Sequence, residues 1–337
     1  MGDIKGKKEV WIDVLRAFAC ICVLLVHSPA KYDGHIPGQY VLAPCNYLFM
    51  AWGVSVFFMI SGALLFYKGQ ELKTFYKKRF SRILIPIVVW SIIYIFFDDL
   101  FYQSDKSHLH RILMIPLTQQ TTLLWFMYTL VGIYLIAPVI STWLSTCSKR
   151  DVDIVLGLWG ITLLLPYLKL LDPDCAKIVG MNGVLHNFYG FVGYALLGYY
   201  LRKYVTIHIL SWKYLLLVIF AFGFPLFIFA TKLLPIDILN DSMSISAALM
   251  SVVAFLFFKD LNYKEGWILT AILKIAEFSF GIYLCQMLFL TPLRHWLTQY
   301  HIHYALQIPI TALISGSLSF LFVWSLSKLP KSKWLFG

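Results

Sequence analysis

Ten apolar runs follow one another along the 337-residue chain, separated by short polar connectors. About 20 consecutive apolar residues cross a hydrocarbon core of about 30 Å as a helix, and these runs approach that length. The pattern therefore predicts an all-α fold, a polytopic membrane bundle of about ten helices. The predicted spans are 11–30, 48–66, 83–100, 122–140, 152–171, 184–201, 212–231, 242–258, 275–293 and 308–327.

The connectors show which side of the membrane each end of a helix faces. An even number of spans puts both termini on one side. If that side is the cytoplasm, 20 of the 28 Lys and Arg residues lie inside, seven lie outside, and Arg16 lies within the membrane. This is a strong positive-inside pattern. We expect one integral-membrane domain over 1–337, without a fused soluble domain and with both termini cytoplasmic.

Composition agrees with this fold class and narrows the function. Hydrophobic residues make up 60% of the chain and charged residues only 13%, which excludes a soluble class. The net charge of +11 is spread over the connectors rather than gathered in one domain, so a nucleic-acid partner is not expected. The six cysteines include no C-x-x-C spacing, and no metal is expected.

The first run carries three polar residues that a spanning helix rarely contains. Arg16 and His27 are eleven residues apart, which at about 100° per residue is three turns plus about 20°, so they share a face about 16 Å long. Asp13 lies one turn before Arg16, close enough to hold its guanidinium. A charge inside a membrane helix costs roughly 3 kcal/mol and usually marks a functional path, although a purely structural pair would show the same pattern.

Two later segments contain residues with a possible role in phosphate binding or in helix packing. Lys78, Arg79 and Arg82 lie at spacings of three and four in the basic connector 67–82, so a helix there would put them on one face. Guanidinium groups bind phosphate oxygens in bidentate fashion, but topology and lipid headgroups would also explain this charge. The run 48–66 contains Gly53, Ser55, Ser61 and Gly62, small residues that predict close packing against the first helix.

The predicted external connectors contain polar residues that could line a sugar site, although an ordinary wetted surface explains them equally well. These residues are His35, Asp98, Asp99, Asp105, His108, His110, Asp172 and Asp174.

Several stretches together resemble a known family. The pattern Asp-x-x-Arg, ten residues and then His is similar to the first helix of the integral-membrane acyltransferase family called acyltransferase type 3, whose bacterial members O-acylate cell-envelope sugars. Further stretches resemble the family in the same order and span nearly the whole chain. They are GVSVFFMISGALL (Gly53 to Leu65), KKRFSRILIP (Lys77 to Pro86), LWFMYTLVGIYLIAP (Leu124 to Pro138), GYALLGYYL (Gly193 to Leu201) and FSFGIYLCQ (Phe278 to Gln286).

The resemblance implies an acyl-CoA-dependent O-acyltransferase in the bacterial cytoplasmic membrane, with acetyl-CoA or another acyl-CoA as co-substrate and an envelope glycan or lipid-linked sugar as acceptor. It assigns catalysis to His27, Arg16 and Asp13. It assigns acyl-CoA binding to Arg79 and Arg82, beside Lys78. The candidate substrate-binding residues are Trp125, Tyr283 and Gln286. Many family members have a histidine where this chain has Gln286, so His27 lacks a second ring base.

Two other classes remain open at this point. A glycan or glycolipid transporter would also explain ten helices and intramembrane charge, although the chain lacks the paired Gly/Pro-broken helices that transporters often show. A sensor or scaffold could use the same fold without catalysis. The outer half of the first helix contains no further cationic group of the kind that would indicate an acidic acyl group.

Overall fold

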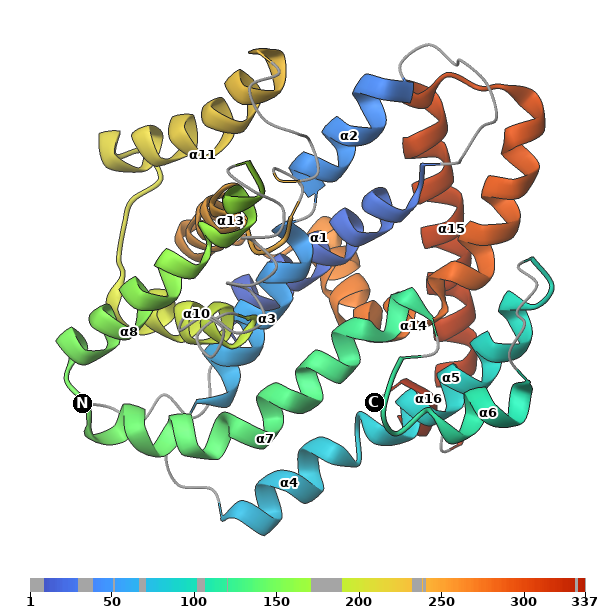
Figure 1. The fold of residues 1–337 in the computed structure, drawn as a ribbon, viewed down its shortest axis with the longest axis horizontal. Helices are drawn as coiled ribbons and strands as arrows, with labels where there is room; N and C mark the ends of the chain where they lie inside the picture. The colour runs from blue at the N-terminus through green and yellow to red at the C-terminus, as the bar shows by residue number, and fades with distance from the viewer. Residues whose placement is uncertain are drawn as a thin grey trace. The chain divides into compact units, whose positions relative to one another are not determined.

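The computed structural model describes most of the chain, and every regular element in the described part is helical (Figure 1). The described residues are 9–29, 39–50, 52–66, 71–101, 107–119, 121–170, 190–231, 238, 241–330 and 333–336. Four residues of the predicted external connectors, His35, Asp105, Asp172 and Asp174, lie outside these ranges.

The helices of the described residues have the following bounds. They are α1 Val10–His27, α2 Gln39–Met50, α3 Trp52–Leu65, α4 Leu72–Phe80, α5 Leu84–Asp98, α6 His108–Leu113, η1 Thr122–Leu124, α7 Trp125–Thr146, α8 Lys149–Thr162, η2 Leu165–Leu170, α10 Val192–Tyr204, α11 Trp212–Thr231, α13 Ile245–Asp260, α14 Trp267–Leu297, η4 Thr298–Tyr300, α15 Tyr304–Ser327 and α16 Lys333–Phe336.

Seven helical segments in the described residues are long and apolar enough to cross a membrane. The three predicted spans that none of these segments covers coincide with shorter helices: α3 has 14 residues, α10 has 13 and α13 has 16. At 1.5 Å per residue each is shorter than a hydrocarbon core of about 30 Å. The all-helical membrane bundle is confirmed, whereas the count of ten and the side of the termini stay predictions.

The predicted connectors contain helices of their own. The sequence predicts a connector over 30–47, but α2 occupies most of the second half of that segment in spite of Pro44 within the helix. The helices α4 and α6 likewise occupy parts of 67–82 and 98–121. These helices are too short or too polar to stand out in a hydropathy pattern that detects only membrane-length runs.

The chain divides into two compact units built from interleaved segments. Unit 1 comprises 1–23, 44–63 and 156–279, and unit 2 comprises 24–43, 64–155 and 280–337. The division falls within α1, so Asp13 and Arg16 belong to unit 1 and His27 to unit 2.

Small residues allow the helices of unit 1 to pack closely. A Cβ atom at Gly53 would lie 2.9 Å from the Ala19 carbonyl oxygen on α1, which confirms the predicted contact with the first helix. Gly62 packs elsewhere, because a Cβ there would lie 1.8 Å from the Ala195 carbonyl oxygen on α10. The prediction that these residues all serve packing against the first helix is therefore wrong for Gly62, which lets α3 and α10 meet backbone to backbone.

Buried side chains tie the helices of unit 2 to backbone carbonyl groups. The Tyr94 hydroxyl on α5 donates to the Leu284 carbonyl on α14, and the Trp90 indole donates to the Leu335 carbonyl on α16 at 2.8 Å. The Cys285 Sγ atom lies 3.8 Å from the carbonyl oxygen of Ser319, so α14 and α15 are neighbours at this level. Because no water competes inside a membrane bundle, such donors need a protein partner.

Candidate functional site

The helix α1 is unbroken from Val10 to His27, so the spacing predicted from the sequence holds in the structure. Arg16 Nη1 lies 2.9 Å from Asp13 Oδ1, and the Asp13 side chain is only 14% exposed. The predicted contact is therefore present: a carboxylate one turn earlier holds the guanidinium and offsets its charge. Helical geometry puts Arg16 and His27 on one face of α1.

The turn that carries His27 is held by side chains from two other helices of unit 2. Arg294 Nη1 on α14 donates to the His27 carbonyl oxygen at 3.1 Å, and Gln307 Nε2 on α15 donates to the Ser28 carbonyl oxygen at 2.8 Å. The Ser28 hydroxyl donates back to the Leu24 carbonyl oxygen at 2.7 Å. The last carbonyl groups of a helix have no partner within it, and a cation beside them favours the helix dipole. These contacts fix the backbone that carries the half-buried His27 side chain.

Tyr283 lies against the start of α7, where Trp125 is the first residue. The Tyr283 hydroxyl donates to the Leu123 carbonyl oxygen, and its ring packs edge-on against Phe126 with centroids 5.5 Å apart. The structure thus brings two of the predicted substrate-binding residues to one place in unit 2. Because its proton is engaged, the Tyr283 hydroxyl can act toward a further ligand only as an acceptor.

Gln286 lies one turn after Tyr283 on α14, and its side chain is buried. The residue is 1% exposed, and within the described part of the chain neither its Oε1 nor its Nε2 atom has a hydrogen-bond partner. A buried polar group without a partner costs about 1–3 kcal/mol. Among the predicted substrate-binding residues, Gln286 therefore has the largest unused capacity to bind a polar group.

The basic cluster of the predicted cytoplasmic side lies at the end of α4. Lys78 and Arg79 belong to the last turn of α4, whereas Arg82 lies beyond the helix in the turn 81–83, so the predicted helical face is shorter than the sequence suggested. Both arginines nevertheless lie within electrostatic reach of the Tyr134 hydroxyl on α7. The Tyr76 hydroxyl donates to the Leu135 carbonyl oxygen at 2.9 Å and so fastens α4 to α7.

Comparison with known protein families gives a match over nearly the whole chain. Residues 9–328 match the family model of an acyltransferase domain, type 3. The chain belongs to this acyltransferase family. Neither the curated proteins nor the solved structures include a significant match to the chain. The family resemblance derived from the sequence is confirmed, and the protein is a membrane acyltransferase.

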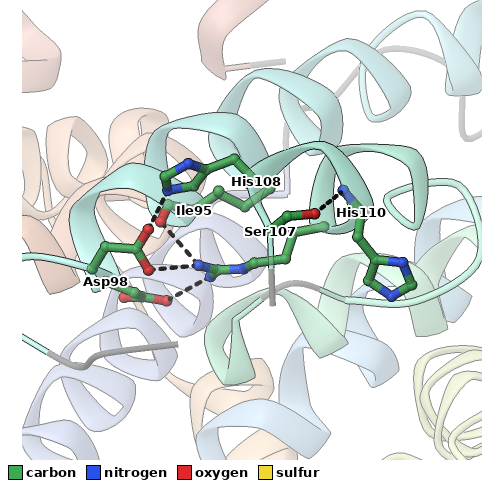
Figure 2. Close-up of polar contacts among 7 residues, drawn as sticks. Ile95, Asp98, Ser107, His108 and His110 are labelled. Atoms are coloured by element: carbon green, nitrogen blue, oxygen red, sulfur yellow. Dashed lines mark hydrogen bonds and ion pairs between the residues drawn. The ribbon is translucent and has the colours of Figure 1, made fainter. Parts of the chain in front are cut away.

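In this acyltransferase, the described charges of the connector 98–121 pair with one another. Arg111, which is 7% exposed, donates to the Ile95 carbonyl oxygen at 3.1 Å and to Asp99 Oδ1 at 2.8 Å (Figure 2). Asp98 Oδ2 lies 4.0 Å from the same guanidinium. The His108 imidazole donates to Asp99 and lowers the pKa of that carboxyl group below its usual value. The cluster fastens α6 to the end of α5, so a structural role explains it without a sugar.

Sequence reasoning missed three residues that hold the described helices in place. Arg294 was counted only as one of the outer cations, and Gln307 and Arg111 were not singled out. Each is a polar residue in or beside an apolar run, which is a usable signal. His110 stays a surface candidate: it is exposed, and its backbone N–H bonds to the Ser107 hydroxyl (Figure 2).

Proposed function

We propose that this acyltransferase moves an acyl group, most simply acetyl, from cytoplasmic acyl-CoA to a hydroxyl group of an extracytoplasmic or lipid-linked glycan. The proposal places the protein in the cytoplasmic membrane of a bacterium. The observation that carries it is the anchoring of the His27 turn by Arg294 and Gln307, on the helix that also presents the Asp13–Arg16 pair.

His27 acts as the base. It takes the proton of the acceptor hydroxyl as that oxygen attacks the thioester carbonyl carbon. The carbon–sulfur bond then breaks, and the thiolate of coenzyme A takes up a proton as it leaves. In a variant of this route, the imidazole is the first nucleophile and is transiently acylated.

Arg16 guides the pantetheine arm or stabilises the developing oxyanion, for which such a donor is worth roughly 3 kcal/mol. Asp13 orients its guanidinium. At the end of α4, Arg79 and Arg82 hold the phosphate groups of coenzyme A, with Lys78 adding positive charge. Trp125, Tyr283 and Gln286 contact the substrates.

The test is the release of coenzyme A thiol from acetyl-CoA by the purified protein in lipid vesicles, with and without a crude envelope glycan fraction. We expect glycan-dependent release by the wild type and its loss in His27→Ala. His208→Ala is the matched control, because the His208 side chain is 71% exposed and lies in a connector. Equal release by wild type and His27→Ala would remove His27 from the chemistry. No release with any donor or acceptor would overturn acyl-CoA dependence.

A further inference from the structure

The side-chain amide of Gln286 is buried and unused. The residue is 1% exposed on α14, and within the described residues both polar atoms of its side chain lack a hydrogen-bond partner. A membrane bundle has no surrounding water that could satisfy these atoms from outside. Native proteins rarely keep such a group without a reason, and binding a ligand is one of them.

A second buried glutamine of unit 2, Gln307, has a side-chain amide that is hydrogen-bonded. Gln307 is fully buried, but its Nε2 atom donates to the Ser28 carbonyl oxygen and to the Thr311 hydroxyl, both at 2.8 Å. The same side chain type is therefore paired at one position and unpaired at the other. This contrast supplies an internal control for any measurement on Gln286.

The unpaired amide lies on the same side of α14 as Arg294, the residue that contacts the turn of His27. Tyr283, Gln286 and Arg294 fall within an arc of about 80° of the helix, and Gln286 precedes Arg294 by about 12 Å along the axis. Arg294 is the residue that binds the His27 carbonyl oxygen.

We propose that the Gln286 amide binds a secondary amide of a substrate. A primary amide presents a donor and an acceptor side by side, and a secondary amide presents the complementary pair. The inference rests on the proposed function, because two substrates of that reaction can supply the group: the pantetheine arm of acyl-CoA contains secondary amides, and so does an N-acylated amino sugar.

The test compares Gln286→Met with Gln307→Met, both of which replace an amide by an apolar chain of similar length. In the absence of ligand, Gln286→Met leaves the thermal midpoint unchanged or raises it, because an unpaired buried amide is removed. Gln307→Met lowers the midpoint, because it leaves the Ser28 carbonyl without its donor. Gln299→Met, at an exposed position of η4, is the surface control.

Binding measurements then identify the source of the amide. If the pantetheine arm is the ligand, Gln286→Met weakens the binding of coenzyme A about tenfold and leaves adenosine 3′,5′-bisphosphate, which lacks the arm, unaffected. If an amino sugar is the ligand, the variant weakens N-acetylglucosamine relative to glucose by a similar factor.

Two results would overturn the inference. One is a variant that binds all four probes as the wild type does. The other is a Gln286→Met midpoint as low as that of Gln307→Met, which would mean that the amide is paired inside the protein. Failure of the wild type to transfer acetyl would remove the proposed function but leave these midpoints and affinities interpretable.

Discussion

His27 depends on residues that do not themselves reach the reacting atoms. Arg294 contacts its backbone carbonyl group from 267 positions further along the chain, and Gln307 contacts the next carbonyl group from 279 positions away. Both act on the position of the imidazole through the backbone. At the residue scale they are therefore positioning residues, and together they keep the last turn of α1 from fraying.

Replacing Arg294 by Ala should lower kcat with acetyl-CoA about 10- to 100-fold, since a displacement of about 1 Å at the reacting group can cost about 10²-fold in rate. The KM for acetyl-CoA should change by less than about twofold, because the substitution removes no contact with acetyl-CoA. Steady-state kinetics of the purified variant measures both. Arg150→Ala, at an exposed position of α8, serves as control and should match the wild type. A loss confined to KM would contradict the positioning role.

At the scale of the helices, cationic side chains of one helix likewise donate hydrogen bonds to the carbonyl groups at the end of another. Arg202 on α10 donates to the Ala63 carbonyl near the end of α3 and pairs with Glu9 at 2.8 Å. Lys259 on α13 donates to three carbonyl groups at the end of α10, those of Leu201, Arg202 and Val205. Helix ends expose unpaired carbonyl groups, and cations satisfy both their hydrogen bonds and the helix dipole.

Lys259→Met should therefore destabilise the protein by about 2 kcal/mol, because hydrogen bonds from a charged donor are worth about 1.5–3 kcal/mol and three carbonyl groups lose theirs. The free energy of unfolding in mixed micelles measures the change. The exposed Lys264, five residues further along, provides the control substitution Lys264→Met. If both variants are equally stable, the ammonium group does not hold the end of α10.

For the whole molecule, the sequence predicted the presence of the long helices better than the residues at which they begin and end. The helix α11, Trp212–Thr231, has the limits that its apolar run indicated. The helix α14 begins at Trp267 rather than at 275, because the mostly apolar residues 267–273 continue the helix on the other side of Lys274, which interrupts the apolar run in the sequence.

The candidate site shows the same difference between local and distant information. The contact between Asp13 and Arg16 could be predicted because both lie on one helix, one turn apart. The contacts of Arg294 and Arg111 could not, because they depend on which helices become neighbours, and hydropathy does not contain that information. The unpaired state of the Gln286 amide is likewise a property of the packed bundle.

The membrane topology of the whole molecule stays a prediction, which rests on the charge pattern. The segment Leu72–Asp98 is long enough to cross the membrane once, so Lys77 near its start and Leu109 beyond its end should lie on opposite sides. Both side chains are exposed, and Leu109 is 67% exposed, so cysteines placed there are accessible to a thiol reagent. The native cysteines are first replaced in a background that keeps its activity.

In intact cells, an impermeant maleimide should label Leu109→Cys and should label Lys77→Cys only after the membrane is opened. This outcome follows from the positive-inside rule, because the connector that contains Lys77 is the most basic of the chain. It would also put the Arg79 cluster on the side where cytoplasmic acyl-CoA is available. Labelling of both positions from outside would contradict the crossing, and the reverse pattern would contradict both the cytoplasmic termini and the assignment of Arg79 and Arg82 to acyl-CoA.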